Sequence, residues 1–519
     1  MAKRGFLALA VLVGLVGTLL SFYQRTTTKP EEPPIVVGRN NTVLFVTNAE
    51  HGLSNVHLAA AFSLVEHHPE VTVHYASWGR MSSKVERIST AARKRSPASP
   101  AITYHELPPP DYYTATGETS LTLITPPGLK GIESMARQMK IFICPWTAEE
   151  HLVLYRFIKG LLRDIDPGVV VLDMLHRPAI DAVREENRLH AVLTPNTLVD
   201  LFAGNQPWLG ALWKYPVTSS GFSFPVAWKD IPANAYMMAR LAYNMLTEPS
   251  LVAKRKYLAA HGIKEPMDFF KMHKPGSSLM ISQDTRGASI PLEYVPPNVT
   301  ATGPIALSIA TAEEQDPELA AWLARAPTVL VNLGSLMEYD NERAAAMAGA
   351  LRVLLQKTGV QVLWKLHRRL DGKFDDSVWQ PLVQEFVDAD RLRVSKWLTV
   401  DPLALLETGN IILSVHHGGA NCYHEAVWAG VPHLILPAWV DLYNYGVLVE
   451  EVGLGRWGNR KAAPALEAKE LSEAFLELVG DGPASMTLRQ NAKKLAKTFT
   501  RPGRDIAADE IAMLAARGH

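Results

Sequence analysis

Residues able to bind phosphate and hydroxyl groups follow a buried-strand pattern near the C-terminus. Residues 411–415 are mostly apolar and β-branched, and His417, Gly419, Asn421 and Glu425 come next. Glycines after a strand let backbone N–H groups approach a diphosphate, and a following helix points the positive end of its dipole at it. His417 can donate a further hydrogen bond there. Because Asn421 and Glu425 are four residues apart, they share one helix face, where Glu425 can accept the hydroxyls of a ribose.

Two further residues extend this candidate site. Asp441 follows the next strand-like run, residues 434–436, and can accept the hydroxyls of a hexose. Trp397, earlier in the chain, offers a flat surface on which a base can stack. The pattern predicts a site for a nucleoside diphosphate sugar.

A proton acceptor for group transfer is expected in the N-terminal half. His51 follows the first strand-like run, residues 43–46, and its reference pKa of about 6.5 suits general base catalysis. Asp173 closes the strand-like run 169–172, and a carboxylate that holds the second imidazole nitrogen stabilises a protonated base. A histidine in such a loop is more often structural, so the pair remains a hypothesis from its residues alone.

The elements that must position these residues form two similar sets. Short β-branched runs alternate with longer helix-like segments, which is typical of parallel sheets flanked by helices. We expect an α/β fold of two doubly wound, Rossmann-like domains with ligands in the cleft between the carboxyl ends of their strands. The strand-like runs are residues 43–46, 71–75, 169–172, 191–193, 329–331, 362–364, 411–415 and 434–436. The expected divisions are a membrane anchor or signal segment at 1–25, a linker at 26–40, an acceptor domain at 41–305 and a donor domain at 306–519.

The C-terminal residues resemble, in order and spacing, the donor-binding signature of the UDP-glycosyltransferases, inverting enzymes of the GT-B fold. The matching residues are Trp397, His417, Gly419, Asn421, Glu425 and Asp441. The resemblance implies that Gly334 and Ser335 touch the diphosphate and that the backbone N–H of Cys422 contributes. It also implies that His51 is the base and Asp173 its orienting acid. A UDP-sugar would be the co-substrate, with no metal or other cofactor, and an α-linked donor would give a β-glycoside.

The chain departs from the family pattern at several positions. The resemblance makes glucose the expected sugar, but Leu442, which cannot hydrogen-bond a hydroxyl, stands where the family usually has Gln after the sugar-binding acid, so other sugars stay open. Cys422 replaces a small hydroxyl residue, and one extra residue separates His51 from Asn55. Such variation resembles a fungal-type branch of the family.

The acceptor is less well specified. Residues 202–245 carry many aromatic side chains among Pro and Gly, which suits a lid over an apolar acceptor such as a terpenoid, sterol, polyketide or lipid alcohol. A packing segment or a membrane-facing surface fits equally well. The rival functions are a non-catalytic, membrane-tethered nucleotide-sugar-binding partner and a GT-B-like epimerase or phosphorylase.

The amino-acid composition limits the classes of partner that the protein can be expected to bind. Lys and Arg total 52 and Asp and Glu total 52, so the basic excess typical of nucleic-acid binding is missing. The two cysteines, Cys144 and Cys422, are too few for a disulfide framework.

The N-terminus predicts membrane attachment. Residues 6–23 are uncharged and mostly apolar, and the run approaches the roughly 20 residues that cross a bilayer. We expect a single-pass anchor in the endoplasmic reticulum; a cleaved signal or a buried helix are the alternatives. Asn40 and Asn298 begin Asn-x-Thr triplets and would be glycosylated in a luminal chain.

Three motifs are set aside. Asp164-Ile165-Asp166 has the DxD form of metal-dependent transferases but precedes a strand, at the end of the sheet away from ligands. Residues 453–458 satisfy GxGxxG but follow a helix-like segment. His67 and His68 belong to a polar helix end.

Overall fold

The computed structural model describes residues 34–117, 123–268, 278–369 and 372–519. The apolar run at 6–23 lies outside these ranges, so the predicted anchor is not described. Within the described ranges, no helix has the length and apolar character that crossing a membrane requires.

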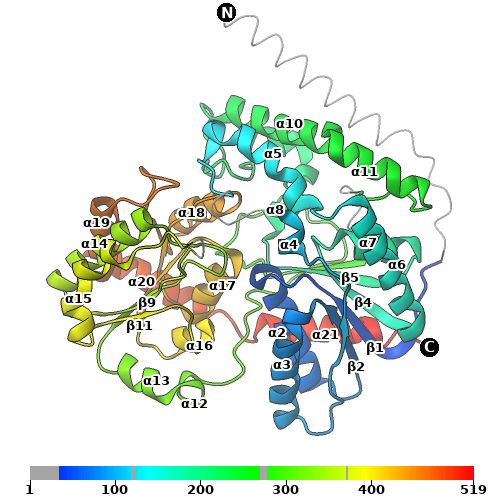
Figure 1. The fold of residues 1–519 in the computed structure, drawn as a ribbon, viewed down its shortest axis with the longest axis horizontal. Coiled ribbons are helices and arrows are strands. Elements are labelled where there is room, and N and C mark those ends of the chain that lie inside the picture. Colours follow the sequence, from blue (N-terminus) through cyan, green and yellow to red (C-terminus); the bar gives the residue numbers. More distant parts are fainter. Residues whose placement is uncertain (1–33, 118–122, 269–277, 370–371) are drawn as a thin grey trace, which may run out of the picture.

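The N-terminal domain is built on a parallel sheet of seven strands in the order β3-β2-β1-β4-β5-β6-β7. Helices cover both of its faces (Figure 1). Its strands are β1 (Arg39–Val46), β2 (Thr72–Ser77), β3 (Thr103–Glu106), β4 (Pro167–Asp173), β5 (His190–Thr194), β6 (Ser278–Ser282) and β7 (Val299–Ala301). Its helices are α2 (His51–His67), α3 (Ser82–Arg95), α4 (Tyr112–Thr116), α5 (Ile132–Ile143), α6 (Ala148–Ile165), α7 (Arg177–Glu185), α8 (Leu198–Phe202), α9 (Gly210–Trp213), α10 (Ile231–Thr247) and α11 (Pro249–Ala260).

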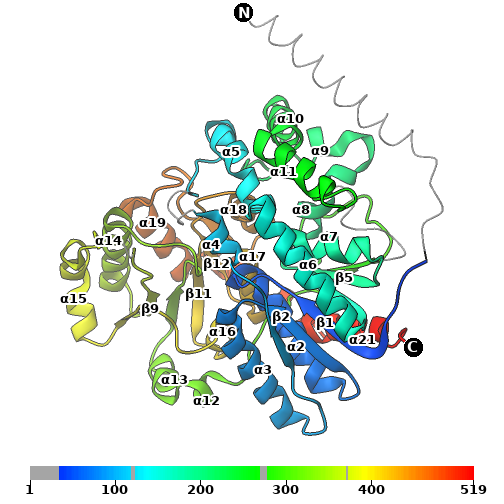
Figure 2. The ribbon, with the colours of Figure 1, turned by 45° about the vertical axis from the view of Figure 1, so that its right-hand side comes forward.

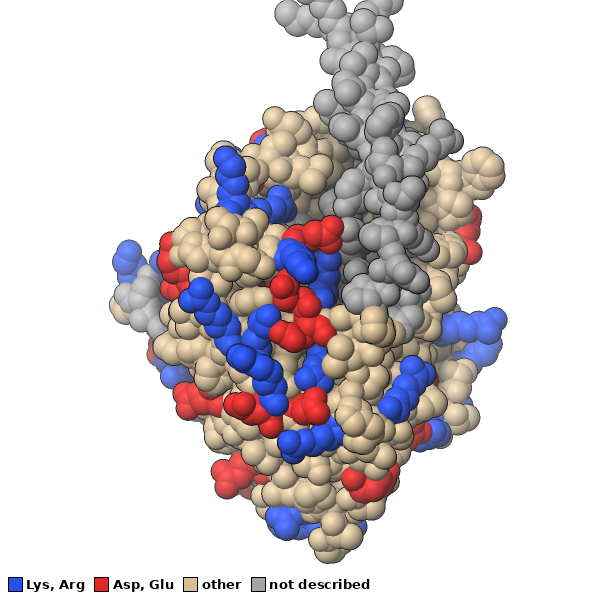
Figure 3. Space-filling model, turned by 90° about the vertical axis from the view of Figure 1, so that its right-hand side faces the viewer, with Lys and Arg blue, Asp and Glu red and all other residues tan. Residues whose placement is uncertain are grey.

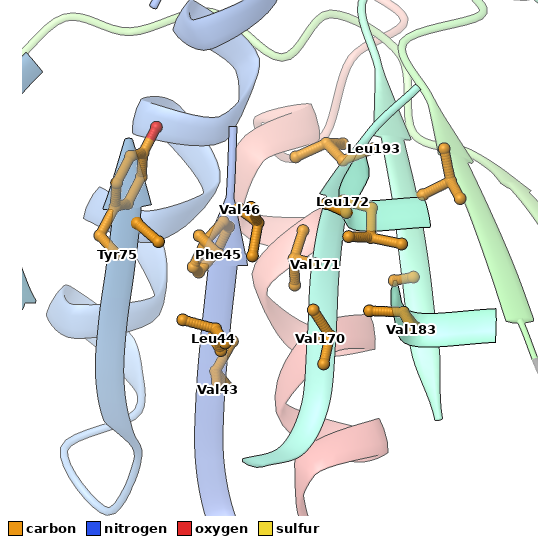
Figure 4. Close-up of a cluster of buried hydrophobic side chains, with 14 of the residues drawn as sticks. Val43, Leu44, Phe45, Val46, Tyr75, Val170, Val171, Leu172, Val183 and Leu193 are labelled. Atoms are coloured by element: carbon orange, nitrogen blue, oxygen red, sulfur yellow. The ribbon is translucent and has the colours of Figure 1, made fainter. Parts of the chain in front are cut away.

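The centre of this sheet is fully buried, which explains its continuous apolar runs. Figure 4 shows Val43, Phe45 and Val46 of β1 beside Val171 and other apolar side chains of β4, with the helix drawn in pale red behind them. A parallel strand covered by helices on both faces has no solvent side, so its residues need not alternate with polar ones.

The C-terminal domain repeats the arrangement with a parallel sheet of six strands in the order β10-β9-β8-β11-β12-β13. Its strands are β8 (Thr328–Val331), β9 (Gln361–Lys365), β10 (Leu392–Ser395), β11 (Ile411–His416), β12 (His433–Ile435) and β13 (Gly455–Trp457). Its helices are α12 (Ala312–Gln315), α13 (Pro317–Leu323), α14 (Asn341–Lys357), α15 (Gln380–Asp388), α16 (Pro402–Glu407), α17 (Ala420–Ala429), α18 (Leu442–Glu451), α19 (Ala468–Val479) and α20 (Pro483–Ala496). Both sheets have the Rossmann-type strand order, in which ligands bind beyond the carboxyl ends of the strands.

The last helix, α21 (Gly503–Ala515), corrects the expected domain division. It packs on α2, β1 and β4, and its Ala507 and Ile511 belong to the N-terminal core, so assigning all of 306–519 to the donor domain is wrong. The chain returns to the first domain at Gly503, where an added Cβ would lie 2.5 Å from the carbonyl oxygen of Pro304 in the connection between the domains. The small apolar residues of α21 pack beside β1. The sequence pattern of residues 306–519 alone does not indicate this packing.

All eight predicted strand-like runs fall on strands, whereas the four edge strands and the inner strand β6 were missed. The edge strands β3, β7, β10 and β13 have three or four residues each. Such short strands give little alternation to recognise.

The charged side chains on one face of the molecule are of both signs. Figure 3 shows Lys and Arg interspersed with Asp and Glu over the described part of that face. Interleaved charges largely cancel within a Debye length, so this face presents no extended field of one sign.

Candidate active site

The carboxyl ends of the two sheets face each other, and two helix N-termini meet between them. α2 begins just after β1 and carries His51, while α17 begins just after β11 (Figures 1 and 2). The side-chain amide of Asn421 donates to the backbone oxygen of Gly52 at 3.0 Å and to that of His51 at 3.4 Å. The predicted base and the predicted diphosphate loop are therefore in direct contact across the cleft.

The predicted diphosphate loop is built around the imidazole of His417. A Cβ on either Gly334 or Gly419 would lie 2.5 Å from its Cε1 atom, so the ring fits only because both neighbours are glycine. Gly334 also has φ of 82°, which favours glycine. Burial lowers the pKa of His417 to about 4, and its buried Nδ1 has no hydrogen-bond partner among the described residues. The ring is thus neutral, with hydrogen-bonding capacity left for a ligand.

Lys365, at the end of β9, adds a positive charge that the sequence analysis missed. Its ammonium donates to the backbone oxygen of Gly334 at 2.8 Å and lies 3.6 Å from the ring centroid of Trp397. Burial lowers its pKa to about 8, and the nearby Cys422 and Glu425 oppose this shift. Its position at the carboxyl end of a strand was the signal available in the sequence.

Trp397 and Glu425 are both neighbours of this lysine. The Trp397 side chain is 44% exposed, with its ring centroid 5.5 Å from that of His51, so an aromatic surface is open in the cleft. Glu425 is buried, and burial raises its pKa to about 8. Cys422 is half-buried, and burial raises the pKa of its thiol. Ser335 is half-buried beside Gly334.

Asp441 is the last residue along the chain of the predicted donor site. It stands at the start of α18 and accepts a hydrogen bond of 3.5 Å from the side chain of Asn196 in the N-terminal domain. Burial, and then the neighbouring Asp200, raise its pKa to about 7. Leu442 is buried in the C-terminal core, so at this position the side chain serves packing and offers no polar group to a sugar.

His51 and Asp173 do not form the expected hydrogen-bonded pair. The carboxylate of Asp173 accepts from the backbone N–H groups of Asn48 at 3.2 Å and Leu175 at 2.8 Å, and its charge faces the buried His57 instead. Each carboxylate oxygen accepts one of these two N–H groups, and among the described residues no hydrogen bond joins the carboxylate to His51. Asp173 holds the loop that carries His51 rather than the imidazole itself.

His51 instead lies among cations. Its Nε2 atom is 3.1 Å from the ammonium of Lys84, on α3. Burial, and then Lys84, Lys365 and Arg80, lower the pKa of His51 to about 4. The imidazole is neutral at pH 7, the state in which it can accept a proton. The preceding Glu50 accepts from the N–H of Tyr113 at 3.1 Å, and burial raises its pKa to about 7.

The aromatic segment does not gather over the cleft as a single lid. Trp208 and Trp228 are 86% and 85% exposed, whereas α10 packs on α5 through Met237 and Leu241. Only part of the segment reaches the second domain, where the N–H of Phe224 donates to Glu451 at 2.7 Å. The prediction of an aromatic-lined acceptor lid is thus not reproduced for the two exposed tryptophans.

The remaining predicted sites lie outside the cleft. Asn40 and Asn298 are exposed. Asp166 ends α6 in a left-handed conformation and pairs with Arg188, at the amino end of β4, as the position of the DxD sequence predicts. Residues 453 and 454 form a turn after α18, but Gly455–Trp457 is strand β13, so interpreting the whole segment as a helix end and turn is wrong.

Comparison with known proteins places this cleft in a family. The sequence model described as "UDP-glucoronosyl and UDP-glucosyl transferase" matches residues 240–482. The chain is 32% identical over 500 residues to "Glycosyltransferase sdnJ" of Sordaria araneosa, covering 91% of this chain and 97% of the relative. It is also 28% identical over 190 residues to "UDP-glycosyltransferase 84B1" of Arabidopsis thaliana, covering 35% of this chain and 39% of the relative.

Solved structures share the architecture. A UDP-glucosyltransferase from Polygonum tinctorium superposes with a TM-score of 0.57 at 18% identity, over 93% of this chain and 99% of that one. UGT2 of Phytolacca americana, complexed with UDP-2fluoro-glucose and pterostilbene, gives 0.58 at 15% identity, over 92% and 99%. The fold is therefore GT-B. The chain belongs to the UDP-glycosyltransferase family and is a glycosyltransferase.

Proposed function

We propose that the protein transfers a sugar, with glucose the first candidate, from a UDP-sugar to a hydroxyl group of a lipophilic small molecule with inversion. The observation that carries this proposal is the contact of the Asn421 amide with the backbone of His51 and Gly52. It brings a neutral histidine on one domain against the anion-binding loop of the other. An acceptor hydroxyl in this cleft would attack the anomeric carbon, His51 would take its proton, and UDP would leave toward α17.

Each donor-facing residue has a physical role in the proposal. Trp397 stacks the base, and Glu425 accepts the ribose hydroxyls. His417 and the N-terminus of α17 bind the diphosphate, beside the Lys365 ammonium. Asp441 holds sugar hydroxyls. An α-linked donor then gives a β-glycoside, because the attack comes from the face opposite the leaving group.

We further propose that transfer needs no metal ion. Lys365, whose ammonium donates to Gly334 in the predicted diphosphate loop, and the N-terminus of α17 would supply positive charge to the leaving diphosphate. Chelation of divalent cations should leave the rate unchanged, and loss of activity that Mg²⁺ restores would contradict this step.

The test of the donor uses the full chain and a panel of UDP-sugars. UDP and UDP-glucose should raise the thermal unfolding midpoint, since a ligand that binds only the folded state stabilises it. Trp397→Ala should reduce that shift, whereas Trp208→Ala, an exposed tryptophan outside the cleft, should leave it unchanged. A midpoint that no UDP-sugar moves would contradict the proposal.

The apolar run at 6–23 supports the further proposal that the chain is membrane-bound, in the endoplasmic reticulum. Fractionation of the tagged full chain tests it, since a membrane protein stays in the pellet after a high-salt or carbonate wash. Release by either wash would contradict an inserted anchor.

A further inference from the structure

A cavity of about 500 Å³ opens on the N-terminal domain. Its walls come from the ends of α4 and α5, the start of α6 and the start of α11, and none of its lining residues belongs to the donor set. Apolar side chains such as Ile141, Leu251 and Tyr257 line it together with Lys140 and Lys254. Cys144, which also lines the cavity, follows directly on α5.

Cys144 belongs to a buried chain of hydrogen-bonding groups. Its sulfur lies 3.4 Å from Nδ1 of His151, and Nε2 of His151 lies 3.1 Å from a carboxylate oxygen of Asp181. A thiol, an imidazole and a carboxylate in this order form the arrangement that activates nucleophilic cysteines. The ammonium of Lys254 lies 2.9 Å from the same sulfur and also donates to the backbone oxygen of Trp146.

The charges around the thiol favour its ionised form. Burial raises the pKa of Cys144, but Lys254 and His151 outweigh it and lower the pKa to about 7. Burial lowers the pKa of His151, but Cys144 and Asp181 outweigh it and raise that pKa. The other ionisable groups that face Cys144 are Arg177 on α7, Tyr112 on α4 and Arg255 on α11. Both pKa shifts favour a Cys144 thiolate next to a His151 imidazolium.

We propose that Cys144 is a second reactive site of this protein, a nucleophilic thiolate that forms covalent adducts with α,β-unsaturated carbonyl compounds entering the adjoining cavity. The sulfur attacks the β-carbon of the activated alkene and a C–S bond forms. The π electrons move to the carbonyl group as an enolate, and the proton of the His151 imidazolium passes to the α-carbon. The addition releases no group and changes no oxidation state. The apolar walls suit the carbon skeleton, and the two lysines suit the carbonyl oxygen.

The test uses the full chain with Cys422→Ser, because the sequence holds only these two cysteines. N-ethylmaleimide, an alkene activated by two carbonyl groups, is the probe, and intact-protein mass measures the adduct between pH 5 and 9. We expect one adduct on Cys144, with a rate that rises with pH through a midpoint near 7, against about 8.5 for a free thiol. No adduct on the folded protein, or a midpoint of 8.5 or above, would overturn the proposal.

Two variants separate activation by the cluster from simple exposure. Lys254→Met removes the positive charge 2.9 Å from the sulfur and should raise the midpoint by at least one pH unit. Lys140→Met, which changes another cavity-lining lysine, should leave the midpoint of the pH profile unchanged. If Lys254→Met fails to fold by circular dichroism, His151→Gln supplies the same upward shift. A midpoint that the folded variant of Lys254 or His151 leaves unmoved would overturn the role of the cluster.

Discussion

Replacing Gly334 with alanine tests whether the diphosphate loop has the packing described. The new Cβ would lie 2.5 Å from Cε1 and 2.8 Å from Nε2 of His417, and the residue would keep a left-handed φ of 82°. A non-glycine residue in that conformation costs about 1–2 kcal/mol, and overpacking adds about 1–3 kcal/mol. The free energy of unfolding should fall by about 2–5 kcal/mol.

Gly409 provides the matched control. Its φ is 75°, yet nothing lies within 4 Å of an added Cβ. Gly409→Ala should therefore cost only the backbone strain, about 1–2 kcal/mol. The difference between the two variants in urea unfolding isolates the collision with His417.

Binding of UDP provides the functional readout of the same change. A His417 ring displaced from the loop loses a hydrogen bond to a charged group, worth about 1.5–3 kcal/mol, or about 10- to 150-fold in Kd. Titration calorimetry of UDP should show this loss for Gly334→Ala and an unchanged Kd for Gly409→Ala. Equal unfolding energies and equal UDP affinities in the two variants would refute the described packing of His417.

Three further predictions concern the ionisable groups. The rate of UDP release should be flat near neutral pH and fall below pH 5, because a base with a pKa of about 4 works only when unprotonated; Lys84→Met removes a nearby cation and should move this acid limb upward. The stability that Glu425 contributes should fall as pH rises from 4.5 toward 8, because folded Glu425 keeps its proton while the unfolded chain releases it, so the difference in unfolding free energy between wild type and Glu425→Gln should change with pH across this window. Asp173→Asn should leave one backbone N–H unsatisfied, cost about 1–3 kcal/mol of stability and lower kcat less than 100-fold, because Asp173 holds the loop rather than His51.

The first two of these predictions have a control in the same chain, and the third has a contradicting outcome. Lys94→Met, exposed on the helix that carries Lys84, should leave the acid limb where it is. Glu385→Gln, at an exposed position, should leave the slope of stability against pH unchanged. A kcat of Asp173→Asn reduced about 10⁴-fold with normal stability would show instead a direct partnership with His51 in the working complex.

The sequence predicted the two-domain plan because buried parallel strands are short, continuous apolar runs. It predicted where the site residues lie for the same reason, since a residue that follows such a run lies at the carboxyl edge of the sheet. His51, His417 and Asp441 were located in this way, and all three lie at the cleft.

The parts that were missed depend on contacts between distant segments. Whether Asp173 reaches His51 is decided by how β4 and the loop after β1 share backbone N–H groups, which spacing does not encode. Lys365 looked like an ordinary strand residue, because its environment comes from Gly334 and Trp397, at 31 and 32 residues' separation. The packing of α21 on the first domain depends on the chain passing close to Pro304 at Gly503, a contact that only the folded chain shows.

The most direct test of the central claim measures UDP release from UDP-glucose with a pooled library of apolar alcohols, for the wild-type chain and His51→Ala. Release that requires both substrates and falls at least 100-fold in the variant is the predicted result. Equal release from His51→Ala, or UDP-sugar binding without release with any acceptor, would contradict a transferase that uses His51 as its base.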